Sequence, residues 1–178
     1  MKRAKLLWVD LEMTGLSPEQ DRILEIAAIA TSWDLKSLAT FEAIVKVDDR
    51  IIKELMVGTF WDQNSTSRTA LITQNQNGRP IDEVQQSLLT FLNQHFGSEI
   101  YLAGNSIHQD RKFIDRELPL VAQKLHYRML DVSAWKIYFE HALRKKFVKP
   151  EAHRALSDIE GSLDELKYYL TFIKNHES

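Results

Sequence analysis

Residues 6–16 read LLWVDLEMTGL, a short apolar run that meets two acids and then a glycine. The apolar residues predict a strand over Leu6–Glu12, and Gly15 predicts that a loop follows it. Side chains two residues apart on a strand point to the same face, so Asp10 and Glu12 project together near the strand's end. Adjacent carboxylates repel each other unless a cation lies between them, and Mg²⁺ and Mn²⁺ prefer carboxylate oxygens. Taken alone, this spacing is a weak signal, because a surface acid beside a turn gives the same pattern.

Strand and helix patterns alternate through the rest of the chain. Runs rich in β-branched residues and Ala predict further strands over Arg22–Trp33, Ser37–Val47, Ile100–Ala103 and Tyr127–Val132. Apolar residues at helical spacing predict a helix that begins at Pro80 and ends at Gly97, others over Ile107–Arg116, Leu120–Leu125, Ser133–Lys145 and Ala155–Lys174, and short helices within Lys53–Thr73. Three strands followed by alternating helices and strands favour an α/β fold with a central mixed sheet flanked by helices.

Length and composition narrow the class of protein. The 178 residues carry no internal repeat or linker, which predicts a single domain over residues 1–178. Hydrophobic residues make up 44% of the chain and charged residues 27%, which excludes a disordered or fibrous protein. There is no Cys, so disulfides, thiol catalysis and thiolate-bound zinc are excluded. No apolar run approaches the roughly 20 residues that cross a bilayer, so we expect a cytoplasmic protein without a membrane anchor.

The charge balance argues against a protein that follows long duplexes. The formal net charge is -2, whereas such affinity comes mainly from neutralising many phosphates. The charge is uneven, because 11 Lys and Arg accompany 6 Asp and Glu between Asp110 and Arg154. This local excess is either ordinary variation or a small anion-facing surface that suits a short ligand.

Two further segments carry acids at the start of helices. The segment GNSIHQD joins a strand to a helix, with Ser106 as a candidate N-cap and Asp110 one turn inside. The segment HRALSD places His153 just ahead of the last helix and Asp158 beside its apolar stripe. His suits general base chemistry near neutral pH, and a carboxylate near a core needs a partner or a metal. Each segment alone also fits a capping residue or an acid that complements the helix dipole.

Together the three segments supply four carboxylates and one His, and this order resembles the DEDDh exonuclease superfamily. The resemblance is closest to the oligoribonuclease family and extends over essentially the whole chain. The motifs that carry it are residues 8–16 (WVDLEMTGL), 22–27 (RILEIA), 104–113 (GNSIHQDRKF), 126–133 (HYRMLDVS), 153–159 (HRALSDI) and 165–169 (ELKYY). The resemblance implies a ribonuclease H-like fold. It also implies 3′→5′ hydrolysis of short single-stranded RNA, down to dinucleotides, with release of 5′-mononucleotides.

The residue chemistry fits phosphodiester hydrolysis as well. Two divalent ions, Mg²⁺ or Mn²⁺, can clamp the attacking and leaving oxygens, and four carboxylates are a sensible complement to their charge. We therefore assign as metal ligands Asp10, Glu12, Asp110 and Asp158. His153 is assigned as the base that takes the proton from the attacking water.

The resemblance also implies substrate contacts. These are Leu16 as a wedge between the two bases, Trp61 as a stacking platform, and Ser106, Arg128 and Ser133 as a cap over the 5′ phosphate that limits substrate length. Tyr127, with His126, would reach the active site of the partner in a homodimer. The alternatives are a loop position tucked on the core for Leu16 and core packing for Trp61.

The chain departs from the family at two positions that bear on base contacts. Thr66 stands where the family usually has a base-contacting His, and Met129 stands where an aromatic or polar residue is common. The five assigned catalytic positions are intact. The nearest alternative function is a DEDDh exonuclease that acts on longer RNA or DNA 3′ ends, of the trimming or proofreading type. A binding module without catalysis would be expected to lack one of the five residues.

Overall fold

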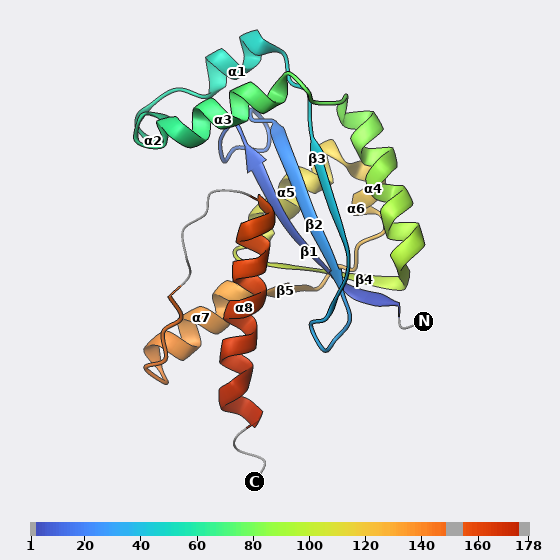
Figure 1. Cartoon of the computed structure of the whole chain (residues 1–178), viewed down its shortest axis with the longest axis vertical. Coiled ribbons are helices and arrows are strands. Elements are labelled where there is room, and N and C mark those ends of the chain that lie inside the picture. The colour runs from blue at the N-terminus through green and yellow to red at the C-terminus, as the bar shows by residue number, and fades with distance from the viewer. Residues whose placement is uncertain (1–2, 149–154, 175–178) are drawn as a thin grey trace.

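The computed structural model describes residues 3–148 and 155–174, which surround one five-stranded sheet (Figure 1). The strands lie in the order β3-β2-β1-β4-β5, with β1 (Ala4–Met13) at the centre. β2 (Ile23–Thr31) and β3 (Ser37–Ile44) extend the sheet antiparallel on one side. β4 (Phe96–Gly104) and β5 (Met129–Asp131) extend it in parallel on the other. The mixed α/β sheet that the sequence predicts is confirmed.

Helices cover both faces of this sheet and one of its ends. They are α1 (Asp49–Leu55), α2 (Thr59–Gln63), α3 (Ser65–Asn75), α4 (Ile81–His95), α5 (His108–Glu117), α6 (Pro119–Ala122), α7 (Val132–His141) and α8 (Ala155–Lys174). Figure 1 shows α1, α2 and α3 gathered beyond the arrowhead of β1, and the first turns of α8 lie beside the same end of the sheet. All nine residues of β2 are buried, which explains why its sequence is continuously apolar apart from one acid and one Thr.

The two faces of β1 belong to two separate hydrophobic clusters. Leu7, Val9 and Leu11 pack on the side of α4, α5 and α6. Leu6 and Trp8 pack on the side of α7 and α8. Because successive side chains on a strand alternate between faces, positions 10 and 12 continue the Trp8 face, toward α8. The alternation of β1 therefore directs its two acids toward the last helix of the chain.

Element boundaries differ from the predictions where two elements follow each other directly. α4 ends at His95, and Gly97 is the second residue of β4 instead of the end of the helix. The reason is that Phe96 is 2% exposed and anchors the strand in the core at once. β3 ends at Ile44, and the chain then forms only an isolated bridge between Val45 and Arg79.

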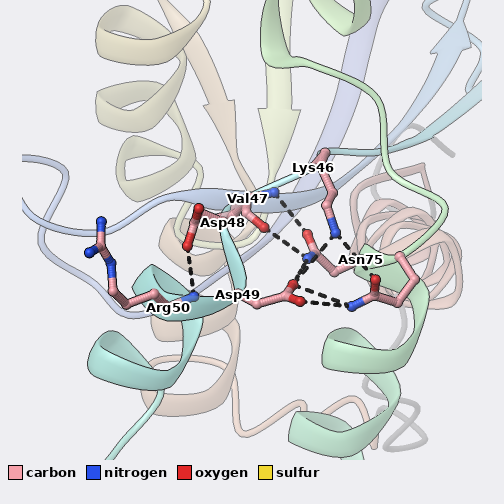
Figure 2. Close-up of polar contacts among 7 residues, drawn as sticks. Lys46, Val47, Asp48, Asp49, Arg50 and Asn75 are labelled. Carbon is pink, nitrogen blue, oxygen red and sulfur yellow. Dashed lines mark hydrogen bonds and ion pairs between the residues drawn. The ribbon is translucent and has the colours of Figure 1, made fainter.

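A polar cluster links α3 to the segment before α1 through hydrogen bonds among Lys46, Val47, Asp49, Asn75 and Gln76. We call it the Asn75 clamp (Figure 2). The buried Asn75 amide accepts a hydrogen bond from the Val47 N–H and donates one to the Val47 carbonyl, both at 2.9 Å. It thus pairs with Val47 as a neighbouring strand would. Around it, Asp49 accepts from Gln76 and Lys46, which lower the pKa of that carboxyl. The clamp closes α1, α2 and α3 into one unit at the end of the sheet.

Candidate active site

Three carboxylates meet at the end of β1. Asp10 and Glu12 come from the strand and Asp158 from the first turn of α8, and one oxygen from each lies within 4.8 Å of the others. All three side chains are partly buried, and the sequence already predicted that this group would meet. An oxygen-only donor set of this size suits a hard divalent cation. The chemistry of the donors therefore fits the metal that the sequence predicts.

Asp110, the fourth predicted acid, approaches the same strand from α5. Its Oδ1 accepts the Leu11 N–H at 3.1 Å, between the two acids of β1. In the described part of the chain it lies outside the group of three whose oxygens are within 4.8 Å. Burial raises the pKa of Asp110 to about 7, since the backbone hydrogen bonds that favour its charged form offset only part of this cost. A nearby cation would favour the ionised form, as a metal site requires.

The acids open into a cavity of about 730 Å³, within the range of ligand pockets. It is lined by the three acids Asp10, Glu12 and Asp158 and by apolar side chains that include Leu16, Val57, Phe60 and Trp61. The cavity therefore combines charged and apolar surface. Such a cavity suits a ligand with a flat apolar part and a charged part.

The loop after β1 holds Leu16 out of the core, with 74% of the residue exposed. The Asp21 carboxylate accepts hydrogen bonds from the Thr14 hydroxyl at 2.8 Å and the Ser17 N–H at 2.9 Å. Gly15 is required here, because an added Cβ would lie 2.5 Å from the Asp21 carboxylate. The alternative of a loop residue tucked onto the core is wrong for Leu16. Its role as a wedge between bases stays a prediction.

Trp61 and Phe60 have opposite exposures. Trp61 is 5% exposed, and its Nε1 donates to the Thr14 carbonyl at 2.9 Å, so the indole packs as a core residue at the edge of the cavity. Phe60 is 65% exposed and stands edge-on to the indole, with ring centroids 5.0 Å apart. Sequence reasoning missed Phe60, and the only signal was an aromatic residue adjacent to Trp61. Phe60 presents the larger open ring surface of the two.

Ser106 and Ser133 meet as the sequence predicts, but Ser106 is not the N-cap of α5. Ile107 occupies that position, and Ser106 has a left-handed backbone with φ 49°. The Ser106 N–H donates to Asp131 Oδ1 and Ser133 Oγ, and the two hydroxyl oxygens lie 3.2 Å apart. Asp131 also caps α7 by accepting the Ser133 N–H. The left-handed turn thus presents two adjacent hydroxyl groups at one place.

A buried acid from the 165–169 motif, which carries no predicted role, holds this turn against α8. Glu165 is 1% exposed and accepts the Asn105 side-chain N–H at 3.0 Å and the Tyr169 hydroxyl at 2.9 Å. Burial and this acid raise the pKa of Tyr169, so the phenol stays a hydrogen-bond donor. Asn105 also donates to Ser162. The network links the residue before Ser106 to the helix that carries Asp158.

The other predicted substrate-contact residues within the described chain lie at the surface. Tyr127 is 71% exposed, and the Arg128 guanidinium carbon lies 5.1 Å from its ring centroid. Thr66 is exposed on α3, and Met129 is 37% exposed. His153 lies outside the described residues. The predicted roles of these residues stay predictions.

The chain is similar to known exonucleases in sequence. A family model described as "Exonuclease" matches residues 7–166. The chain is 38% identical over 169 residues to an oligoribonuclease of Chromobacterium violaceum, and the match covers 92% of each chain. It is 37% identical over 177 residues to an oligoribonuclease of Coxiella burnetii, which covers 96% of this chain and 94% of the relative.

Among solved structures, the chain resembles an exonuclease I of E. coli in a complex with single-stranded DNA, with a TM-score of 0.66 and 14% identity. The match covers 99% of this chain but 43% of that one. An exonuclease I of Methylocaldum szegediense gives a TM-score of 0.61 and 14% identity, and covers 89% and 38%. These likenesses concern the fold. No helix within residues 3–148 and 155–174 is long and apolar enough to cross a membrane.

Proposed function

Because the chain belongs to the oligoribonuclease family of exonucleases, we propose that it is a 3′→5′ exoribonuclease that hydrolyses short oligoribonucleotides. Its fold is the ribonuclease H-like fold that the sequence implies. The observation that carries the proposal is the meeting of Asp10, Glu12 and Asp158 in a cavity that is also lined by Leu16, Phe60 and Trp61. Dinucleotides are the preferred substrates in this proposal, and 5′-mononucleotides are the products. Residues 1–178 form one exonuclease domain.

Divalent metal ions are the cofactor class that fits the family and the acidic cluster. We propose two ions, Mg²⁺ or Mn²⁺, held by Asp10, Glu12, Asp110 and Asp158. The oxygen-only donor set supports this assignment, as does the buried Asp110, whose ionised form needs a nearby positive charge. When bound, the ions supply Lewis acidity toward the scissile phosphate and the attacking water.

The side chains of this protein position the substrate and move the proton. His153, just ahead of α8 in the sequence, takes the proton from the attacking water. Leu16 separates the two bases, and its rigid loop keeps it exposed without a partner in the core. The Phe60–Trp61 pair supplies the aromatic wall for one base, and stacking of this kind tolerates any base. These contacts hold the phosphodiester against the acids.

The two hydroxyls of Ser106 and Ser133 support a cap over the 5′ phosphate, with Arg128 as its bidentate partner. In this proposal the cap closes the substrate groove beyond the second nucleotide. Longer strands would then bind poorly, which accounts for a preference for short substrates.

A homodimer completes the proposal, with Tyr127 reaching the active site of the partner. An open apolar groove between α7 and α8 supports a protein contact, and it is lined by Trp135, Tyr138, Phe139, Leu143, Phe172 and Ile173. Apolar surface of this kind usually marks an interaction site. The enzyme would work in the cytoplasm, where short RNA fragments arise.

A time course on 5′-labelled RNA of two, five and twenty nucleotides with Mn²⁺ tests the function. We expect rapid loss of the dinucleotide and a nearly untouched twenty-mer. Preference for the twenty-mer would keep the metal chemistry but move the protein to the trimming or processive exonucleases.

A matched pair of variants on α8 controls for contaminating nuclease. Asp158→Asn should abolish turnover in every reaction. Asp164→Asn, an exposed acid on the same helix that pairs with Lys167, should leave it unchanged. Residual activity in the first variant would remove Asp158 from the site.

A further inference from the structure

A continuous row of planar side chains leads from the turn after β2 to Arg128, and we call it the ring row. Trp33 lies 5.5 Å from Tyr101, Tyr101 lies 4.5 Å from His126, and His126 lies 4.5 Å from Tyr127, measured between ring centroids. The Arg128 guanidinium then covers the outer ring of the row at 5.1 Å. The row thus joins three segments that are distant in sequence and ends at the cation of the proposed phosphate cap.

Backbone contacts fix the inner part of this row. The His126 N–H donates to the Ile100 carbonyl at 2.8 Å, and the His126 carbonyl accepts from Arg111 at 3.3 Å. The His126 ring in turn accepts the Arg128 N–H through Nδ1 at 3.0 Å. His126 is therefore held on both of its backbone groups, and its ring sets the backbone direction of Arg128.

At the outer end of the row, the ring of Tyr127 contacts His126 on the one hand and the Arg128 guanidinium on the other. Tyr127 is 71% exposed, and a side chain so open normally samples several rotamers. Its ring is stacked on His126 at an interplanar angle of 29°, so its position depends on that of the His126 ring. Tyr101 packs against the same His126 ring with centroids 4.5 Å apart, and Trp33, itself 61% exposed, packs against Tyr101. Removing Tyr101 should therefore loosen Tyr127 and the guanidinium upon it.

We propose that Tyr101 and Trp33 are positioning residues for Arg128 and thereby set the preference of the enzyme for a 5′-phosphorylated end. The proposal rests on the proposed function, which places Arg128 at the 5′ phosphate. An arginine that is already ordered loses less side-chain entropy when it binds phosphate. The ring row orders the guanidinium before substrate arrives, and it acts on binding of the phosphate and not on the chemical step.

The test compares two dinucleotides that differ only in the presence of the 5′ phosphate. For Tyr101→Leu we expect KM for the phosphorylated dinucleotide to rise about 3- to 10-fold, with kcat within about twofold, because ring pairs contribute modestly beyond their buried area. KM for the unphosphorylated dinucleotide should stay constant. Trp33→Ala should show the same selective effect at smaller size. Tyr101→Phe, which keeps the ring, should behave as wild type.

A ring pair elsewhere provides the matched control. Phe41 and Phe91 lie 5.6 Å apart at 48°, nearly the geometry of Trp33 and Tyr101, but they join β3 to α4. Phe41→Leu should therefore leave the ratio of the two KM values unchanged. Equal changes with both substrates in Tyr101→Leu, or none, would overturn the positioning role alone. A wild-type enzyme that cleaves both dinucleotides with equal KM would overturn the positioning role together with the cap, and failure to cleave either would overturn the proposed function itself.

Discussion

The carboxylate of Asp110 accepts a hydrogen bond from the backbone N–H of Leu11 at 3.1 Å. This bond joins α5 to the position of β1 that lies between the two acids of the strand. It also holds a buried carboxyl in place, and within residues 3–148 and 155–174 no cationic side chain lowers its pKa. Such a carboxyl is costly to ionise unless a cation is near, so the stability of the protein and its function make opposite demands on it.

The first prediction concerns how the stability of the metal-free protein depends on pH. Burial raises the pKa of Asp110 from 3.8 to about 7, so between pH 4 and 7 this carboxyl keeps a proton in the folded protein that it has lost in the unfolded chain. The free energy of unfolding therefore falls as pH rises through this window, and the loss is complete above pH 7. Asp110→Asn stays neutral at every pH. At pH 8, without metal, we expect it to be more stable than wild type by about 2–4 kcal/mol, or about 5–10 °C in Tm, and inactive.

Thermal unfolding in the presence of a chelator at pH 5 and pH 8 measures this difference. Asp115→Asn is the matched control, because Asp115 lies on the same helix, is exposed and pairs with Arg111. Burial also raises the pKa of Glu117, so some dependence on pH should remain in Asp110→Asn. A variant that is less stable than wild type at pH 8 would show that the ionised Asp110 carboxylate does not destabilise the metal-free protein, so that burial does not raise its pKa.

The second prediction separates metal ligands from the general base. Saturating Mn²⁺ at about 100 times its Kd should stabilise the wild type by about 2.7 kcal/mol, since only the folded state holds the site. Asp158→Asn should lose most of this stabilisation and all turnover. His153→Asn should keep the stabilisation while kcat falls about 10²- to 10⁴-fold. Measuring Tm and kcat for each variant shows whether the residue binds metal or acts as the base. Loss of metal stabilisation in His153→Asn would contradict its assignment as the base.

The third prediction concerns the aromatic wall. Phe60→Ala should raise KM for dinucleotides about 5- to 150-fold with little change in kcat, because a stacked base is worth about 1–3 kcal/mol. Trp61→Phe should mainly lower Tm, because it loses the hydrogen bond to the Thr14 carbonyl. Leu38→Ala, an exposed apolar residue on β3, serves as the control for both. A larger change in KM for Trp61→Phe than for Phe60→Ala would return the stacking role to Trp61.

The sequence predicted the central acids because two independent periodicities agree on where they point. Alternation along β1 places Asp10 and Glu12 on the Trp8 face, and the apolar stripe of α8 places Asp158 beside the surface that packs there. Both patterns are local, and burial of the two stripes against each other brings the acids together. The mixed sheet flanked by helices followed from the alternation of strand and helix patterns, whereas the order of its strands was not predicted.

Which of the two aromatic side chains of the short helix α2 is exposed could not be predicted in this way. Phe60 and Trp61 are adjacent, and which ring is buried depends on the Thr14 carbonyl, 47 residues earlier. The backbone of Ser106 was missed for a similar reason, because its left-handed turn is set by Asp131 and Ser133. Both features depend on partners that are distant in the sequence, so no local pattern indicates them.

The fourth prediction concerns the Asn75 clamp. Asn75→Ala removes the two hydrogen bonds to Val47 and the one to Asp49, and it leaves the Val47 N–H and carbonyl without their Asn75 partner, so we expect a loss of about 2–4 kcal/mol in the free energy of unfolding. Because the clamp holds the unit that carries Phe60, KM for dinucleotides should also rise while kcat changes little. Gln76→Ala, one residue later and exposed, should change stability by less than about 0.5 kcal/mol. Denaturant unfolding measures both variants, and equal losses would show that the cluster acts through Asp49 and not through the pairing of Asn75 with Val47.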